Sequence, residues 1–323
     1  MAAALSAATA SAALSVSGGA EVARSPSNIA TELSGITWAG GETYYAVNDA
    51  PPAGTLFKLS IRLNPDGEIL SCAVGDGVPL AGSRDLEGCA YDPVCGTVWV
   101  SMEKSSTPIR EYNPKTGEQL RTAPVPGIFI DKRRTNYGFE ALTISPDGMA
   151  MWTCNEEALL CDGPKSSTEA GSVVRLLRFS RSTPGGDWTP DGQWAYQAEP
   201  LGNAWGFGNS QRSGVAGLCA LPDGTLLVLE REFSNYDFKL ALFQVDFTGA
   251  TEISSLPSLA NAKYAKVGKH PLVGRMSTGF VNYEGVCLGP PLPESSRALL
   301  FISDAGGSPH LPKAAMSKTL TAR

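Results

Sequence analysis

A short phrase recurs along the chain and limits the folds that are open to it. Each copy is an apolar strand that contains Gly or Glu-Gly, followed by a turn, a second strand and an acidic residue. The copies occupy residues 34–49, 86–103, 139–156, 215–230 and 283–304. Five copies of one unit predict a repeat architecture.

The spacing of the copies indicates which architecture. Their equivalent small residues are Gly35, Gly88, Ala141, Gly217 and Gly285, which lie 53, 53, 76 and 68 residues apart. A propeller blade of four strands needs roughly 40 to 50 residues, and more with loop insertions. Solenoid repeats of about 20 to 47 residues are too short, and no segment shows a sustained helical period. We therefore predict an all-β fold, a β-propeller with five blades. A sixth blade remains an alternative, formed from residues 244–280 or by pairing of the two termini.

Turn signals divide the copies into strands and set the segment boundaries. The sequences NPDG (64–67), SPDG (145–148) and LPDG (221–224) are typical of tight turns between strands. Residues 161–171 and 182–192 read as insertions, which usually form surface loops on the working face of a propeller. We predict a signal-like or disordered N-terminal segment over 1–27, a propeller over 28–307 and a C-terminal tail without clear strand character over 308–323.

Composition restricts the partners. The formal net charge of −6 argues against general affinity for nucleic acid or anionic membranes. After the N-terminal segment no run of about 18 apolar residues is present, so we expect no membrane span. The N-terminal segment is Ala/Ser-rich but lacks basic residues before Arg24, so it is an incomplete signal for a secreted or periplasmic protein. We expect a monomer that acts on a small molecule.

The seven cysteines contain no CxxC pair and no Cys/His cluster, which argues against a zinc site. Cys89, Cys219 and Cys287 hold equivalent places in three copies, which predicts buried strand positions. Cys89 with Cys95, or Cys154 with Cys161, could form local disulfides.

Four runs resemble a known family. They are DLEGCAYD (85–92), YGFEALTISPDG (137–148), LLVLEREF (226–233) and YEGV (283–286). In this order they are similar to the phytase-like family, described as having esterase-like activity of phytase, and the likeness covers about residues 33–304. The resemblance implies a β-propeller, commonly exported in bacteria, that hydrolyses esters or phosphoesters. The chain departs from the pattern at Ser34 and Ala216, where other copies carry Glu, and the closing C-terminal strand of the family is not recognisable.

Carboxylates recur where chemistry is expected. The first strand of each propeller blade lines the central channel, so equivalent Glu residues should converge there. The candidate catalytic residues are Glu87, Glu140 and Glu284. A second ring ends the second strands, and its candidate metal ligands are Asp49, Glu103, Glu156, Glu230 and Asp304. Crowded carboxylates repel one another, and Ca²⁺, which takes six to eight oxygen ligands, would relieve this. The structural alternative is that these residues accept backbone hydrogen bonds between blades.

Basic residues lie beside several of these positions. The candidate substrate-binding residues are Arg84, Lys104, Arg133, Arg134 and Arg231, which could hold a phosphate or carboxylate group. The alternative is a set of solvated loops with surface ion pairs. Only two histidines are present and no G-x-S-x-G sequence, so serine-esterase chemistry is disfavoured.

The sequence therefore predicts a calcium-assisted hydrolase of phosphate esters or related esters, in which a channel Glu activates water. One alternative is cleavage of lactones or carboxyl esters, because gluconolactonase-type propellers also begin blades with Glu-Gly. Another is a non-catalytic propeller that binds a partner and uses its carboxylates only to stabilise the blades.

Overall fold

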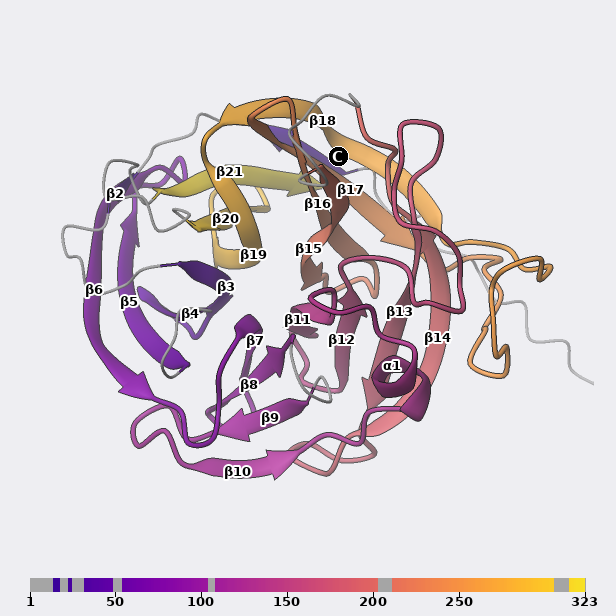
Figure 1. Cartoon of the computed structure of the whole chain (residues 1–323). Coiled ribbons are helices and arrows are strands. Elements are labelled where there is room, and N and C mark those ends of the chain that lie inside the picture. The colour runs from indigo at the N-terminus through magenta and orange to yellow at the C-terminus, as the bar shows by residue number, and fades with distance from the viewer. Residues whose placement is uncertain are drawn as a thin grey trace, which may run out of the picture.

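The chain forms a five-bladed β-propeller, in which five antiparallel sheets stand in a ring around a central axis (Figure 1). The computed structural model describes residues 14–17, 23–24, 32–48, 54–103, 108–202, 211–304 and 314–322. Both the all-β class and the count of five blades agree with the prediction from the repeated phrase. No helix in these ranges is both long and apolar enough to cross a membrane.

Each blade runs from an inner strand at the axis to an outer strand at the rim. Blade 1 holds β3 (Leu33–Trp38), β4 (Thr43–Asn48), β5 (Thr55–Leu63) and β6 (Ile69–Pro79). Blade 2 holds β7 (Leu86–Asp92), β8 (Thr97–Met102), β9 (Ile109–Tyr112) and β10 (Gln119–Thr122). The short helix α1 (Gly127–Asp131) precedes blade 3, which holds β11 (Phe139–Ile144), β12 (Ala150–Asn155), β13 (Val173–Ser180) and β14 (Thr189–Gln197).

Blades 4 and 5 complete the ring. Blade 4 holds β15 (Arg212–Ala220), β16 (Leu226–Ser234), β17 (Asp237–Asp246) and β18 (Gly268–Gly279). Blade 5 holds β19 (Asn282–Pro291), β20 (Ser296–Asp304), β21 (Ala314–Ala322) and β1 (Leu14–Ser17), and β2 (Ala23–Arg24) also pairs with β21.

The two ends of the chain close the ring within blade 5. Strand β1 pairs antiparallel with β21, with Leu14 opposite Ala322. The expectation that residues 308–323 lack strand character is therefore wrong for β21. Residues 244–280 build parts of β17 and β18 in blade 4, and the paired termini complete blade 5, so the alternative of a sixth blade is also wrong. Strand β14 likewise begins inside the predicted 182–192 loop.

The glycine of the repeated phrase allows the inner strands to pack closely around the axis. A Cβ atom on Gly88 would lie 2.4 Å from the backbone N of Leu142 in blade 3. One on Gly35 would lie 2.5 Å from the backbone O of Glu87 in blade 2. Both distances are shorter than real Cβ contacts, so backbone packing between blades explains why the phrase requires glycine at these two positions.

The cysteines are all free, so neither proposed disulfide forms. Cys89, Cys219 and Cys287 are buried in inner strands, as their equivalent places in the phrase predicted. The interior is a series of apolar clusters between neighbouring blades, such as the one that joins blades 4 and 5 through Leu229, Leu242 and Phe301. These clusters fix the blades relative to one another and hold the inner strands in register.

Candidate functional site

Every inner strand is irregular at the same point of the repeated phrase. The pairing with the second strand shifts between Leu33 and Gly35, Leu86 and Cys89, Phe139 and Ala141, Val215 and Gly217, and Tyr283 and Gly285. A β-bulge re-aims the side chain of its extra residue and is common beside active sites. The residues at or beside the five irregularities are Ser34, Glu87, Glu140, Ala216 and Glu284.

The second ring follows from the register of the second strands. Met102, Asn155, Glu230 and Ser303 lie opposite equivalent residues of the inner strands. The residue that follows each of them is therefore equivalent too, and these residues are Glu103, Glu156, Arg231 and Asp304. Blade 4 thus contributes Arg231 to the ring of acidic residues, at the position for which the repeated phrase predicts Glu230.

Arg231 lies at the centre of the resulting cluster. Its Nη2 atom is 3.3 Å from Glu140 Oε1 and also contacts the carboxylate of Glu156. Its Nη1 atom contacts the carboxylate of Glu284. The Arg231 side chain is 3% exposed, and its Nε atom has no hydrogen-bond partner. Residues of blades 3, 4 and 5 therefore meet around one buried guanidinium.

Asn282 extends this cluster within blade 5. Its Nδ2 atom donates to Glu284 Oε1 at 2.7 Å and to Asp304 Oδ2 at 3.4 Å. Glu284 therefore accepts from both an amide and a guanidinium.

At the described positions of the two rings, carboxyl groups outnumber the one cationic side chain, Arg231. The two rings hold the described carboxyl groups of Glu87, Glu103, Glu140, Glu156, Glu284 and Asp304, of which the five Glu are buried. Burial and then the neighbouring Glu156 hold the pKa of Glu140 well above its usual range, although Arg231 opposes the shift. Glu140 consequently keeps its proton at a pH at which an exposed carboxyl group is ionised.

The axis is narrow beside these carboxyl groups. Glu140 and Glu284 line a cavity of about 10 Å³, together with residues of all five inner strands. This is about the space of one water molecule. The cluster therefore has room for a water next to two of its carboxyl groups.

The other predicted site residues lie outside the cluster, and some of them form hydrogen bonds with backbone atoms. Glu230 accepts from Lys269 Nζ at 2.7 Å and from the backbone N–H of Glu199 at 2.9 Å, so the structure does not bring it into the cluster. Arg134 donates to the backbone O of Ala158 and Gly163 and thereby holds a loop. Arg84 is exposed and Arg133 is half-buried. Asp49 and Lys104 lie outside the described residues.

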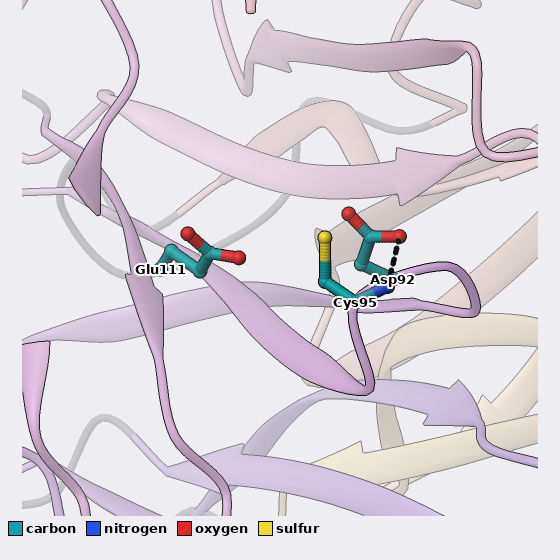
Figure 2. Close-up of side chains that lie close together, drawn as sticks. All are labelled: Asp92, Cys95 and Glu111. Carbon is teal, nitrogen blue, oxygen red and sulfur yellow. Dashed lines mark hydrogen bonds between the residues drawn. The ribbon is translucent and has the colours of Figure 1, made fainter. Parts of the chain in front are cut away.

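A second acidic group was not foreseen from the sequence. Figure 2 shows Asp92, Cys95 and Glu111, whose ligand atoms lie within 4.8 Å of one another. Both carboxylates already have cationic partners, since Asp92 pairs with Arg181 at 2.7 Å and Glu111 with Arg121 at 2.5 Å. Of the residues that the structure describes, these three are the one group that meets this geometric condition for a metal, and its charges are already compensated.

The sequence analysis also missed Glu157, which follows Glu156. It is buried and accepts from the backbone N–H of Ser166, with its two carboxylate oxygens 3.3 and 3.2 Å from the nitrogen. Burial first, and the nearby Glu156 in addition, raise the pKa of Glu157 to about 7. The Glu-Glu pair at the end of a buried strand was the available signal.

Comparison with known proteins gives a family match and distant structural likenesses. The family model described as "Phytase-like: Esterase-like activity of phytase" matches residues 30–305. No curated protein sequence matches. The exo-β-1,3-galactanase 1,3Gal43A of Clostridium thermocellum is 10% identical with a TM-score of 0.46, over 94% of this chain and 61% of that one. A hypothetical protein from Leishmania major is 7% identical with a TM-score of 0.45, over 94% of this chain and 89% of that one. A protein of unknown function from Bacteroides thetaiotaomicron is 13% identical with a TM-score of 0.41, over 96% of this chain and 76% of that one.

Proposed function

The chain belongs to the phytase-like family, and from that premise we propose that it is a hydrolase of phosphate esters or related esters. The observation that carries the proposal is the cluster around Arg231, where Glu140, whose pKa is held well above its usual range, meets Glu156 and Glu284 around one buried guanidinium. Pairs of acidic groups whose surroundings separate their proton affinities are the usual equipment for general acid and base catalysis.

The two carboxyl groups closest to the axial cavity take different roles. Glu284, held by Arg231 and Asn282, accepts a proton from the attacking water. Glu140, which retains its proton, gives it to the leaving alcohol oxygen as the ester bond breaks. Glu87 stands at the equivalent irregularity of blade 2 and is the third catalytic candidate.

A phosphate ester carries negative charge, and closely placed carboxylates disfavour a further anion beside them. We therefore include Ca²⁺ in the proposal, because carboxylate oxygens are the ligands that this cation prefers. Glu103, Glu156 and Asp304, with Asp49, would hold it, and when bound it would neutralise charge on the phosphoryl oxygens. Arg84 and Arg133 remain for further anionic groups of the substrate, as does Lys104. Arg134 is already engaged by backbone oxygens.

Cleavage of a carboxyl ester or lactone is the second candidate. The observation that favours it is the set of contacts made by Arg231, because a neutral substrate needs no cationic partner. The Nη atoms of Arg231 contact three carboxylates and are therefore not available to a substrate anion.

The experiment measures hydrolysis by the metal-stripped protein, with and without added Ca²⁺. Substrates are an aryl phosphate, phytate, an aryl acetate and an aliphatic lactone. Glu140→Gln is the test variant. The matched control is Glu232→Gln, which alters another buried acid of β16, paired with Lys239 and Arg275.

Calcium-dependent release of phosphate that is lost in Glu140→Gln and kept in Glu232→Gln supports the phosphoesterase. Calcium-independent cleavage of the acetate or lactone, with the same response to the two variants, supports the second candidate. No turnover of any substrate, or equal turnover by both variants, overturns a catalytic role for this cluster and favours a binding propeller.

A further inference from the structure

A second pocket lies at the opposite end of the propeller axis. The acidic cluster sits where the inner strands begin, and this pocket is lined by residues where the same strands end. It has a volume of about 180 Å³. Its lining includes Thr37, Trp38, Tyr91, Thr143, Cys287 and Arg297.

Arg297 is the one charged residue among those that line this pocket. Its guanidinium lies 5.4 Å from the ring centre of Trp38. Its Nε and Nη2 atoms donate to the backbone O of Gly289 at 3.2 and 2.7 Å. Among the residues that the structure describes, no carboxylate forms an ion pair with Arg297 and no group accepts a hydrogen bond from its Nη1 atom.

The neutral polar groups of the pocket also offer donors. Thr37 Oγ1 accepts the backbone N–H of Tyr91 at 2.9 Å, and Thr143 Oγ1 accepts that of Ala220 at 3.0 Å. Each hydroxyl group therefore uses an acceptor site within the protein, and its hydrogen has no acceptor among the residues described. A ligand that supplies acceptors is the complement of such a site.

The rest of the wall is uncharged. Burial raises the pKa of Cys219 to about 12 and the pKa of Cys287 well above its usual range, so both thiols are neutral. Trp38 and Tyr91 add aromatic surface. One cation among apolar and aromatic walls suits a monoanion with an apolar body better than a multiply charged anion.

We propose that this pocket binds a small organic carboxylate, whose carboxylate group pairs with Arg297 while its apolar part lies against Trp38 and Tyr91. The site is separate from the acidic cluster and does not depend on the hydrolase proposed above.

Calorimetric titration with benzoate tests the proposal, with benzamide as the uncharged ligand of the same shape. Arg297→Gln removes the charge, and Arg297→Lys restores it. The matched control is Arg178→Gln, because Arg178 lies 4.9 Å from the Trp194 ring centre but already pairs with Asp191 at 2.8 Å. Glu140→Gln serves as the control at the other mouth.

We expect benzoate to bind the wild type at least ten-fold more tightly than benzamide. Binding should weaken at least ten-fold in Arg297→Gln, largely return in Arg297→Lys and stay unchanged in both control variants. Failure of the wild type to bind benzoate, or equal affinity for benzoate and benzamide, overturns the proposal. So does unchanged affinity in a folded Arg297→Gln variant. The comparison of the two ligands on the wild type decides the matter even where that variant does not fold.

Discussion

Two buried arginines of this propeller meet carboxylates in opposite ways. Arg175 on β13 holds both oxygens of Asp162, at 2.7 and 2.9 Å, and its other N–H groups bond to Gln193 and to two backbone oxygens. Both side chains of this pair are fully buried. Arg231 instead contacts three carboxylates and leaves Nε without a partner. The first arrangement is balanced and fully bonded, and the second is neither.

The difference separates two uses of the same chemistry. A balanced buried pair joins segments that are distant in sequence, as the Arg181–Asp92 pair does between blades 3 and 2. Crowded carboxylates around a single cation cost stability, because burial and mutual repulsion both disfavour their ionised forms. Such a cost is typical of functional sites. The same kind of substitution, a carboxylate replaced by its amide, should therefore have different consequences in the two regions.

The largest expected effect is on activity in the central region. Glu140→Gln should lower kcat/KM of the proposed hydrolysis by about 10²- to 10⁴-fold, the usual contribution of a general acid. Asp162→Asn should leave the kcat/KM of the protein that remains folded near its wild-type value. Steady-state kinetics on active-site-titrated protein checks both. A similar loss in the two variants would erase the functional distinction between the regions.

Stability should respond in the reverse direction. Asp162→Asn leaves the buried guanidinium of Arg175 without its carboxylate, and it should lower the free energy of unfolding by about 3 to 5 kcal/mol. Glu140→Gln removes a group whose ionisation is opposed by its surroundings, so it should leave that free energy unchanged or raise it. Urea unfolding of both variants at pH 7 measures the contrast. Loss of stability in Glu140→Gln as large as in Asp162→Asn would contradict it.

The pH dependence of stability sharpens the comparison through Glu157. Its pKa in the folded protein is about 7, above the usual 4.5, so the folded state binds the proton more tightly than the unfolded state. Stability from this group is present below about pH 4.5 and is lost as pH rises through about 7. Since one pKa unit corresponds to about 1.4 kcal/mol, the loss is of the order of 3 kcal/mol. Glu157→Gln should flatten this slope.

Asp92 should behave with the opposite sign. Burial opposes its ionisation, but Arg181 and the backbone N–H groups of Val94 and Cys95 together outweigh burial and lower its pKa. The stability that Asp92 contributes is present above its ordinary pKa, and it is lost as pH falls through the lower pKa of the folded state. Unfolding free energies from pH 4 to 8 for wild type and Glu157→Gln isolate the Glu157 part. Glu169→Gln, an exposed substitution in the following loop, is the control. Parallel curves for wild type and Glu157→Gln would exclude the effect.

The repeated phrase was sufficient to predict the blades, because its physical causes act locally. Gly35 and Gly88 are required where inner strands pass one another closely, and the same irregularity recurs in every inner strand. The closure of blade 5 was not predictable in this way. Strand β21 is rich in Ala, which has low strand propensity, and it becomes a strand by pairing with β20 and β1.

The second ring was predicted correctly in outline, but in blade 4 the predicted member, Glu230, is one residue away from the actual one, Arg231. Glu230 and Arg231 are adjacent, and alternation along β16 sends their side chains to opposite sides. The register set by the bulge decides which of them reaches the axis, and it selects Arg231. No local property of the two residues carries that information. The raised pKa of Glu157 likewise depends on its burial in the folded protein, where Ser166 of the following loop donates to it.

The smallest effect is expected at the group of Asp92, Cys95 and Glu111, which satisfies a distance test for a metal but belongs with the balanced arginine pairs. A cation would have to displace Arg181 from Asp92 and Arg121 from Glu111 before either carboxylate became a ligand. While these ion pairs persist, only the exposed Cys95 is left to bind a cation. Cys95→Ser should therefore change the unfolding free energy by less than about 0.5 kcal/mol, and Zn²⁺ should not shift Tm of the wild type. Stoichiometric Zn²⁺ binding that disappears in Cys95→Ser would show that charge balance does not distinguish the structural clusters from the functional one.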